Sequence, residues 1–501
     1  EKAGCHTQVG KQMATLLEQY LDRSPDIDDR LIQSIGAPAA TNSCPTQDDI
    51  KDLKNEVVVH FGVGHVSDPG LTELNTPIFE GWATAGGYPD PPVIDWLRNG
   101  APSGVTQEIP RTGIFPESHA PPDEQFDLSY HSPESCNYLS MDECPEGEGI
   151  IKGLEENKYI KGFNTVKEAK RYLRGGRIVI SKLAVVTSVK EDGTIKYCLI
   201  LDCRVSGTNS ATTKYERILL PLVWDVVRNA LDLMAGEVDG SEVSWLVCDF
   251  QDAFYKLPLN WAEQGYYAVV FRGRVYIWLR VGQGSLNGPA LFGRLAAMVG
   301  RFTQSCFDSS ECLLQIYIDD PIATIYANES RTRRIKAMLL LIWLLLGFGL
   351  STNKAQEGRQ VGWIGFLLTA EGTTIHAAVK KKFMEEFDGE THKLHRTNLI
   401  PAKRLRSYTG RANHIANLLP AWRPFLDYLW AAVTSISTPY GTIRQVRRSR
   451  AGRGLVWKKQ VLQSLKWIRA FLSLAHGPLE RSWSLAAYLE PAGILLFTFD
   501  A

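Results

Sequence analysis

The sequence predicts an α+β fold in which antiparallel hairpins alternate irregularly with helices. Two apolar runs meet at Asp319-Asp320, which is the pattern of a hairpin with a tight turn. An Asp192-Gly193 turn joins two further runs of alternating polarity. Longer apolar segments with helical periodicity lie between these hairpins. Because strands joined by tight turns pair antiparallel, this order argues against a doubly wound parallel sheet.

The predicted elements follow one another from residue 165. A helix begins at Thr165, where Glu168 completes a capping box, and ends at Gly175. The later elements are strands at 177–189 and 195–202, a helix at 220–234, a strand that ends near Asp249, a helix that Pro289 opens and that runs to about residue 303, the Asp319-Asp320 hairpin and a helix at 332–346.

Composition indicates a globular chain with uneven charge. Its 501 residues are 44% hydrophobic and 22% charged, which suffices for several subdomains and excludes a fibrous or wholly disordered protein. Residues 1–150 carry 25 acids against 8 Lys or Arg and are rich in Pro and Gly in their later part, so we expect a partly ordered upstream region of unknown role. Residues 391–470 carry 16 Lys or Arg against one acid. This stretch would suit a polyanion, and a solvated basic face is the alternative.

Cysteine usage and hydropathy indicate the compartment. Nine cysteines occur without paired C-x-x-C units, so no zinc spacing is present, and thiols in apolar strands favour a reducing, intracellular setting in the cytoplasm or nucleus. No secretory signal pattern begins the sequence. The apolar run 338–348 is too short to span a bilayer and predicts a buried helix, so no membrane association is expected.

Three carboxylates are candidates for metal-assisted phosphoryl chemistry. Asp319 and Asp320 lie at the tip of the predicted hairpin, where paired oxygen ligands can hold a hard cation. Asp249 lies near the end of a buried strand. Two strands could therefore bring three acids together. The alternatives are a solvated turn for the Asp-Asp pair and a capping role for Asp249.

A glycine-rich loop lies between these acids in the chain. Gly282, Gly284 and Gly288 precede Pro289, which fits the first turn of the following helix. Glycines permit close backbone approach, and the amide-rich helix start could face a phosphate or a base. An ordinary glycine-rich loop is the alternative.

Together these blocks resemble the reverse transcriptases of retroelements, over roughly residues 150–435. The matching motifs, in family order, are D-x-x-x-A-F at 249–254, Q-G-x-x-x-x-P-x-x-F at 283–292, Y-x-D-D at 317–320, a lysine motif at 350–354 and a W-x-G-F primer grip at 363–366. The resemblance implies a right-hand polymerase with fingers, a palm built on an antiparallel sheet, and a helical thumb. The downstream motifs at 405–410 and 419–425 resemble LTR-type or DIRS-like elements.

This resemblance implies a domain order. Residues 1–150 are the upstream region, 151–377 the fingers and palm, 378–437 the helical thumb and 438–490 a basic connection segment. Residues 444–453 are expected to form a basic loop that touches phosphates. Residues 491–501 resemble the first strand of a ribonuclease H domain with its catalytic acid at Asp500, which suggests a fragment of a longer reading frame.

The same resemblance implies an RNA-directed DNA polymerase. Its expected partners are an RNA template, a DNA primer and deoxynucleoside triphosphates, and its expected cofactor is a pair of Mg²⁺ ions, with Mn²⁺ as a substitute. Asp249 and Asp319 are the expected bridging ligands and Asp320 an auxiliary acid, since Mg²⁺ takes a few carboxylates and completes its shell from phosphates and water.

Further residues acquire roles by resemblance. Phe254 is expected to exclude ribonucleotides sterically, and Gln283 and Gly284 to line the nucleotide pocket. Lys354 is expected to contact or protonate the leaving pyrophosphate. The residues expected to hold the primer are Tyr317, Trp363 and Gly365. Without the resemblance, core packing would account for Phe254 and Trp363, and solvent exposure for Lys354.

The sequence departs from the family pattern at three places. Cys198 occupies the position of a triphosphate-binding arginine, and a thiol cannot make bidentate phosphate contacts. Lys190, Lys196 or Arg204 would then bind the triphosphate instead. Pro321 removes a backbone donor from the second hairpin strand, and Val281-Gly282 replaces the usual Leu-Pro. A catalytically decayed copy that only binds nucleic acid is therefore one alternative, and an RNA-dependent RNA polymerase is another.

Overall fold

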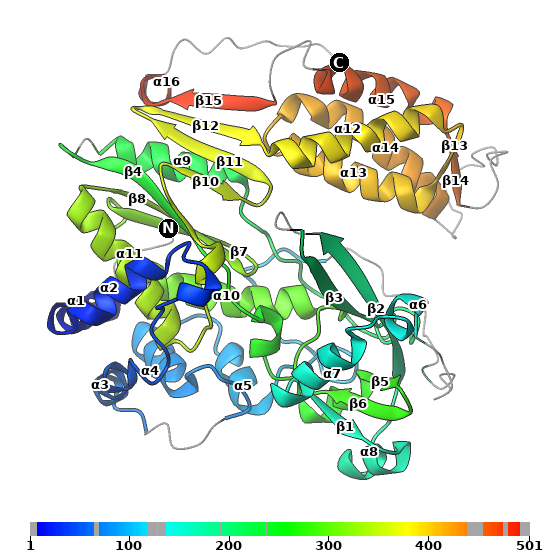
Figure 1. Ribbon diagram of the computed structural model, residues 1–501, viewed down its shortest axis with the longest axis horizontal. Helices are drawn as coiled ribbons and strands as arrows, with labels where there is room; N and C mark the ends of the chain where they lie inside the picture. Colours follow the sequence, from blue (N-terminus) through cyan, green and yellow to red (C-terminus); the bar gives the residue numbers. More distant parts are fainter. Residues whose placement is uncertain are drawn as a thin grey trace.

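The computed structural model describes residues 8–64, 70–118, 128, 137–189, 193–236, 238–437, 454–473 and 479–490. Mixed helices and mainly antiparallel sheets confirm the α+β prediction. In Figure 1 a sheet and a helical bundle form the upper layer, and the remaining elements lie below it. No helix among the described residues is long and apolar enough to cross a membrane.

The central sheet carries the predicted Asp319-Asp320 hairpin. Its strand order is β7-β8-β4-β9 and every pair is antiparallel. Successive β4 side chains enter different cores: Leu246 packs on one side and Trp245 on the other, as the period of two in a strand requires. The strands are β4 (Glu242–Val247), β7 (Cys312–Tyr317), β8 (Asp320–Ala327) and β9 (Gln356–Gly358).

One face of this sheet is covered by helices from the upstream region and by two helices from the middle of the sequence. The upstream helices pack on α10 and α11 and share one hydrophobic core with them. The apolar run of α11 is fully buried there, as predicted. The sequence did not predict this integration of the upstream region. The helices are α1 (Gln8–Arg23), α2 (Pro25–Ser34), α3 (Lys51–Phe61), α4 (Thr76–Gly86), α5 (Pro92–Asn99), α10 (Gly288–Ser305) and α11 (Glu329–Leu345).

The opposite face packs on α9 (Val223–Met234) and on the upper layer (Figure 1). That layer contains the sheet β10-β11-β12-β15 and a bundle in which α15 packs on α12 and α14. The predicted connection segment shares one core with the predicted thumb and pairs with it through β13 and β14, and its strand β15 pairs with β12. The elements are β10 (Gln360–Trp363), β11 (Phe366–Glu371), β12 (Thr374–Val379), α12 (Lys381–Arg396), β13 (Leu399–Pro401), α13 (Ala402–Ala416), α14 (Arg423–Ser437), β14 (Leu455–Trp457), α15 (Lys458–Leu472), β15 (Glu480–Ser484) and α16 (Leu485–Leu489).

A second sheet, of order β1-β6-β5-β2-β3, forms the lower right of Figure 1. The predicted hairpin is present, with Val189 opposite Ile195. The predicted capped helix is α8, where the Glu168 amide donates to the Thr165 hydroxyl at 3.1 Å. The elements are α6 (Leu139–Asp142), α7 (Gly147–Glu156), β1 (Ile160–Phe163), α8 (Val166–Tyr172), β2 (Ile180–Val189), β3 (Ile195–Asp202), β5 (Ala268–Phe271) and β6 (Arg274–Trp278).

Candidate active site

The end of β4 is fixed to the turn of the β7–β8 hairpin by backbone hydrogen bonds. The Cys248 amide donates to the Pro321 carbonyl at 3.2 Å, and the Phe250 amide donates to the Asp319 carbonyl at 3.0 Å. Asp249 lies between these two bonds. The strand order therefore places Asp249 beside the Asp319-Asp320 turn, although 70 residues separate them in sequence.

The hairpin forms despite Pro321. Tyr317 pairs with Asp320 and Ile316 pairs with Pro321 across the strands. The turn is made by Ile318 and Asp319, and Ile318 adopts a left-handed φ of +58°. A β-branched residue in this region is strained, and such strain is typical of functional turns.

Three carboxyl groups gather at this turn. Burial, followed by the nearby Asp319 and Asp249 carboxylates, raises the pKa of Asp320 to about 7. Burial and Asp249 also raise the pKa of Asp319. The Lys354 ammonium contacts Asp249 Oδ2 at 3.0 Å and offsets part of this charge. Three carboxylates that repel one another in a partly buried place favour a bound cation.

The chemistry of the donors fits a hard divalent cation, since all three are carboxylates. Among the residues that the structure describes, no group of three or more His, Cys, Asp or Glu side chains is arranged to hold a metal ion. The Lys354 ammonium is the cation that lies against Asp249 here.

The predicted primer-grip residues pack beside the acids. Trp363 Nε1 donates to the Asp320 carbonyl at 3.1 Å, and its ring meets Tyr317 edge-on at a centroid distance of 6.3 Å. Gly365 has a φ of +87°, and a Cβ there would lie 3.1 Å from His414 Nε2. Trp363 and Tyr317 therefore support the hairpin turn, and the expected contact of these residues with a primer stays a prediction.

Lys380 is a residue that the sequence reasoning missed. It lies between β12 and α12, and its charge lowers the pKa of Asp320 against the larger effects that raise it. Its ammonium lies over Gly362, where a Cβ would collide with it. No motif marks this lysine, and only the packing of the upper sheet on the central sheet brings it to the acids.

The predicted nucleotide-pocket residues lie on two adjoining segments. Phe254 belongs to the short helix η3 (Ala253–Lys256) and stacks on Phe292 at a centroid distance of 5.4 Å. Gln283 is exposed. Gly284 lies so close to the Leu201 carbonyl of β3 that a Cβ would overlap it, at 1.7 Å. Glycine is therefore required where the loop crosses the β2–β3 sheet.

The candidates for a triphosphate contact differ in their surroundings. Lys196 lowers the pKa of Asp319, so its charge acts at the acids. Arg204 instead binds Asp202 through Nε at 2.9 Å and Nη2 at 3.0 Å. Cys198 is partly buried on β3. Lys190 and Asp500 lie outside the described residues, as do the basic loop at 444–453 and the strand expected at 491–501.

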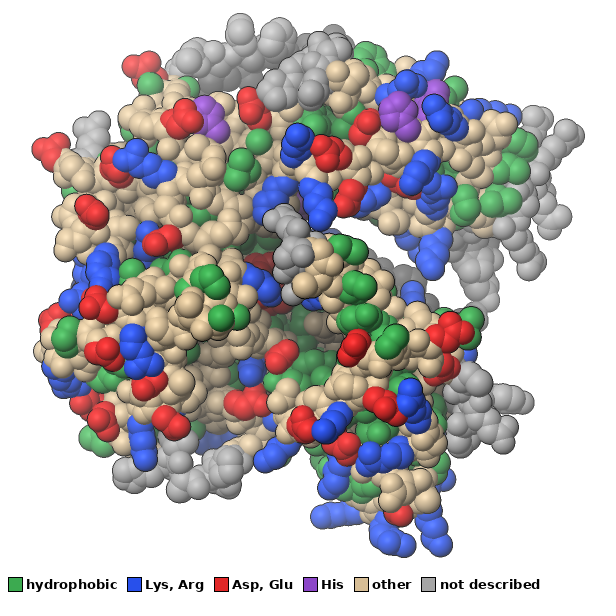
Figure 2. All heavy atoms as spheres, viewed as in Figure 1, with side chains coloured by type: hydrophobic (Ala, Val, Ile, Leu, Met, Phe, Trp, Pro, Cys, Tyr) green, Lys and Arg blue, Asp and Glu red, His purple; other side chains and the backbone are tan. Residues whose placement is uncertain are grey.

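The face in Figure 2 is hollowed between the helical bundle and the lower sheet, with Lys and Arg side chains along its upper rim.

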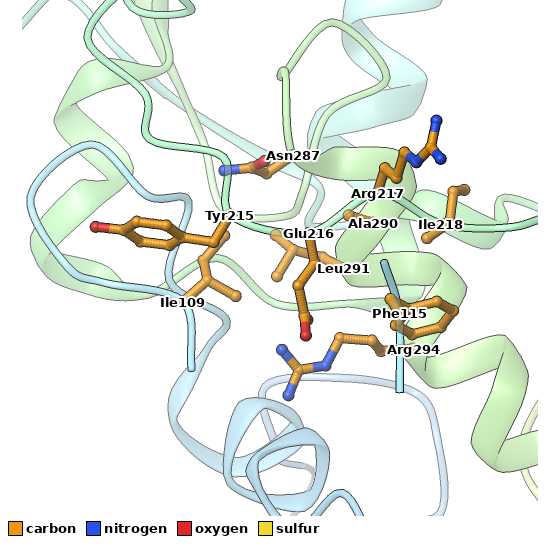
Figure 3. Close-up of a pocket in the computed structure, with 10 residues that line it drawn as sticks. All are labelled: Ile109, Phe115, Tyr215, Glu216, Arg217, Ile218, Asn287, Ala290, Leu291 and Arg294. Carbon is orange, nitrogen blue, oxygen red and sulfur yellow. The ribbon is translucent and has the colours of Figure 1, made fainter. Parts of the chain in front are cut away.

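In a separate pocket beside α10, the charged side chains Arg294 and Glu216 already have hydrogen-bond partners within the protein (Figure 3). There Arg294 binds Asp90, and Glu216 accepts hydrogen bonds from the amides of Thr112 and Gly113. This pocket joins the upstream loop to α10 and does not include the three aspartates.

Comparison with known proteins identifies part of the chain. Residues 190–368 match the family model described as "Reverse transcriptase (RNA-dependent DNA polymerase)". The Pro-Pol polyprotein of Simian foamy virus type 1 is 26% identical over 196 residues, which cover 37% of this chain and 15% of that protein. The Gag-Pol polyprotein of Walleye dermal sarcoma virus is 30% identical over 132 residues, covering 26% and 7%. The chain matches at most 15% of the length of these relatives.

Two solved structures also resemble the chain. One is titled as the foamy viral protease-reverse transcriptase dRH in complex with double-stranded DNA, with 17% identity, a TM-score of 0.44 and coverage of 84% of this chain and 60% of that chain. The other is titled as the foamy viral protease-reverse transcriptase in complex with RNA/DNA hybrid, with 16% identity, a TM-score of 0.43 and coverage of 90% and 46%. Residues 190–368 of this chain are therefore similar to the reverse transcriptase family.

Proposed function

We propose that the chain is a retroelement RNA-directed DNA polymerase that extends a DNA primer on an RNA template. The observation that carries this proposal is that Asp249 lies beside the Asp319-Asp320 turn, which leaves repelling carboxylates in a partly buried place. The family match supports it. Foamy viral enzymes solved with double-stranded DNA and with RNA/DNA hybrid support nucleic acid as the partner.

Asp249 and Asp319 are proposed to bind two Mg²⁺ ions, or Mn²⁺, with Asp320 as an auxiliary acid. Ions bound there would activate the primer 3′-hydroxyl and stabilise the leaving pyrophosphate. Trp363 fixes the Asp320 carbonyl and so holds the acids at the primer end. Lys354 holds a proton beside Asp249, where it can meet the leaving group.

We further propose that Lys196 replaces the missing triphosphate arginine. Lys196 and Cys198 are two residues apart on β3, so their side chains leave the same face of the strand. Lys196 acts on Asp319 electrostatically, whereas Arg204 is already paired with Asp202. A lysine binds phosphate as a point charge, without the bidentate geometry of arginine.

Primer extension on an RNA template tests the proposal. The wild-type chain should add deoxynucleotides in Mg²⁺ or Mn²⁺, and Asp319→Asn should abolish addition. The matched control is Asp95→Asn, because Asp95 is an exposed acid on α5 that bonds only locally to Asn99. Absence of extension by the wild type, or full activity of Asp319→Asn, would contradict the polymerase assignment.

Nucleotide choice tests the proposed role of Phe254. A bulky ring beside the sugar excludes a 2′-hydroxyl, so Phe254→Val should raise ribonucleotide incorporation relative to the wild type. Equal use of both sugars by the wild type would instead favour an RNA-dependent RNA polymerase.

A further inference from the structure

Four consecutive residues of the upstream region, Thr72 to Asn75, lie between two loops that belong to the proposed active site. One loop is η3 with its flanking residues, which follows Asp249 and carries Phe254. The other is the segment from the end of α11 to η5 (Thr352–Lys354), which carries Lys354. We propose that this four-residue brace positions both loops, and that Glu73 in particular determines how well the enzyme binds deoxynucleotides. This inference rests on the proposed polymerase function.

The brace holds η3 through charge and through a hydrogen bond. Glu73 Oε2 lies 2.9 Å from the Lys256 ammonium, and Glu73 Oε1 lies 4.0 Å from Arg280. The Lys256 and Arg280 side chains are only 9% and 8% exposed, and no hydrogen-bond partner is found for Arg280 Nε. The Thr72 hydroxyl donates to the Lys256 carbonyl. Two buried cations, Lys256 of η3 and Arg280, are thus paired with one carboxylate from the upstream region.

The same residues close the end of α11. The Asn75 amide donates to the Leu346 carbonyl at 3.0 Å, and its side chain donates to the Leu345 carbonyl. These carbonyls have no partner within the helix. Gly347 follows with a φ of +95°, and a Cβ there would lie 2.7 Å from the Glu73 carbonyl. The chain then reaches Ser351, whose amide donates to the Asp249 carbonyl at 2.9 Å.

Through these contacts the residues Thr72 to Asn75 connect η3 to the segment that follows α11. A loss of charge at Glu73 leaves Lys256 and Arg280 uncompensated, and a buried cation without a partner moves toward water. Movement of Lys256 carries η3 with it, and with η3 the proposed sugar-binding Phe254. The expected effect falls on nucleotide binding, because neither loop includes the primer-grip residues.

Steady-state primer extension by the full chain tests the brace. Glu73→Gln should raise the KM for deoxynucleotides on the order of tenfold, with kcat and primer-template affinity within about twofold of wild type. The double variant Glu73→Gln/Lys256→Met also removes the ammonium that has lost its partner. It should restore at least about half of the binding free energy lost through the rise in KM. The control is Glu80→Gln on α4, since Glu80 pairs with the exposed Arg98. A wild-type KM in a folded Glu73→Gln, or equal effects on KM and primer-template affinity, would overturn the proposal.

A second measurement is independent of catalysis. Amide hydrogen exchange in peptides spanning 250–258 and 346–355 should be faster in Glu73→Gln than in wild type, and unchanged in Glu80→Gln. If Glu73→Gln does not fold, Thr72→Val removes one bond at similar volume and should accelerate exchange in 250–258. Unchanged exchange in the folded variant refutes the brace. Failure of the wild type to extend a primer, with the expected exchange pattern, refutes only the polymerase assignment.

Discussion

Replacing Asp90 by Asn tests whether the upstream region and the central domain that contains α10 fold as one unit. Asp90 precedes α5 and binds Arg294 of α10, through Nε at 2.8 Å and Nη2 at 2.5 Å. The two side chains are 4% and 3% exposed. Arg294 also donates to the Pro110 carbonyl and lies 4.3 Å from the Trp96 ring centroid. This ion pair is the most deeply buried link between the two regions among the described ion pairs.

The expected cost follows from what remains after the change. Asp90→Asn keeps the volume but leaves the Arg294 guanidinium buried without a counter-charge. Breaking a buried pair in this way costs about 3–5 kcal/mol. Because the Pro110 carbonyl and the Trp96 face stay in contact with Arg294, we expect the lower end, about 3 kcal/mol.

Urea unfolding followed by tryptophan fluorescence measures this cost. The control is Glu56→Gln, because the Arg23–Glu56 pair is 51% and 41% exposed and should contribute at most about 1 kcal/mol. The double variant Asp90→Leu/Arg294→Met should recover most of the loss, since an apolar pair of similar volume avoids the stranded charge. A loss below about 1 kcal/mol in Asp90→Asn, or an early transition confined to the upstream region, would refute the shared core.

Three further predictions concern the site. The pKa of Asp320 is about 7 in the folded protein and about 4 in the unfolded chain. The folded protein therefore binds this proton more tightly, and the free energy of unfolding falls as the pH rises from about 4 to about 7. Without metal at pH 8, Asp320→Asn should therefore be more stable than wild type by about 1–3 kcal/mol, and below pH about 4 the difference should vanish, as urea unfolding at each pH would measure. Trp363→Phe removes the bond to the Asp320 carbonyl and should cost about 1 kcal/mol in urea unfolding. Gly365→Ala, at φ +87° and against His414, should cost more in thermal unfolding than Gly372→Ala, at φ +55° in open space.

Each of these has an outcome that contradicts it. A stability difference that is independent of pH would mean that Asp320 ionises normally in the folded protein. An unchanged Trp363→Phe would mean that the indole bond is replaced by water. Equal effects at Gly365 and Gly372 would show that His414 moves aside without loss of stability. Only the strain of a positive φ would then remain at both positions.

Local sequence patterns predicted much of the central sheet. The hairpin at Asp319-Asp320, the strand before Asp249 and the helix opened by Pro289 all depend on periodicity and turn chemistry within a few residues. The order of the motifs predicted that Asp249 lies near Asp319 and Asp320. Backbone hydrogen bonds from Cys248 and Phe250 to the hairpin turn place Asp249 there. The assignment of metal binding and substrate contacts to these residues stays a prediction.

Residues that act across long sequence distances were not predictable in this way. Glu73 and Lys380 stand in no motif, and their neighbours are 183 and 60 residues away at Lys256 and Asp320. The upstream acids suggested a partly ordered region of unknown role. Their helices instead cover α10 and α11, because the apolar surface of those two helices needs more cover than the family-matched residues alone provide.

By itself, the sequence determined the main elements of the central sheet, the turn that carries two acids and the resemblance of residues 190–368 to reverse transcriptases, because these follow from short-range periodicity and from motif order. Only the tertiary structure decided which charges neutralise one another and which surfaces share a core. Those choices depend on complementary packing between segments far apart in the chain, and no local pattern records them. The brace at Thr72 to Asn75 is such a case, since its role appears only once both loops are folded against it.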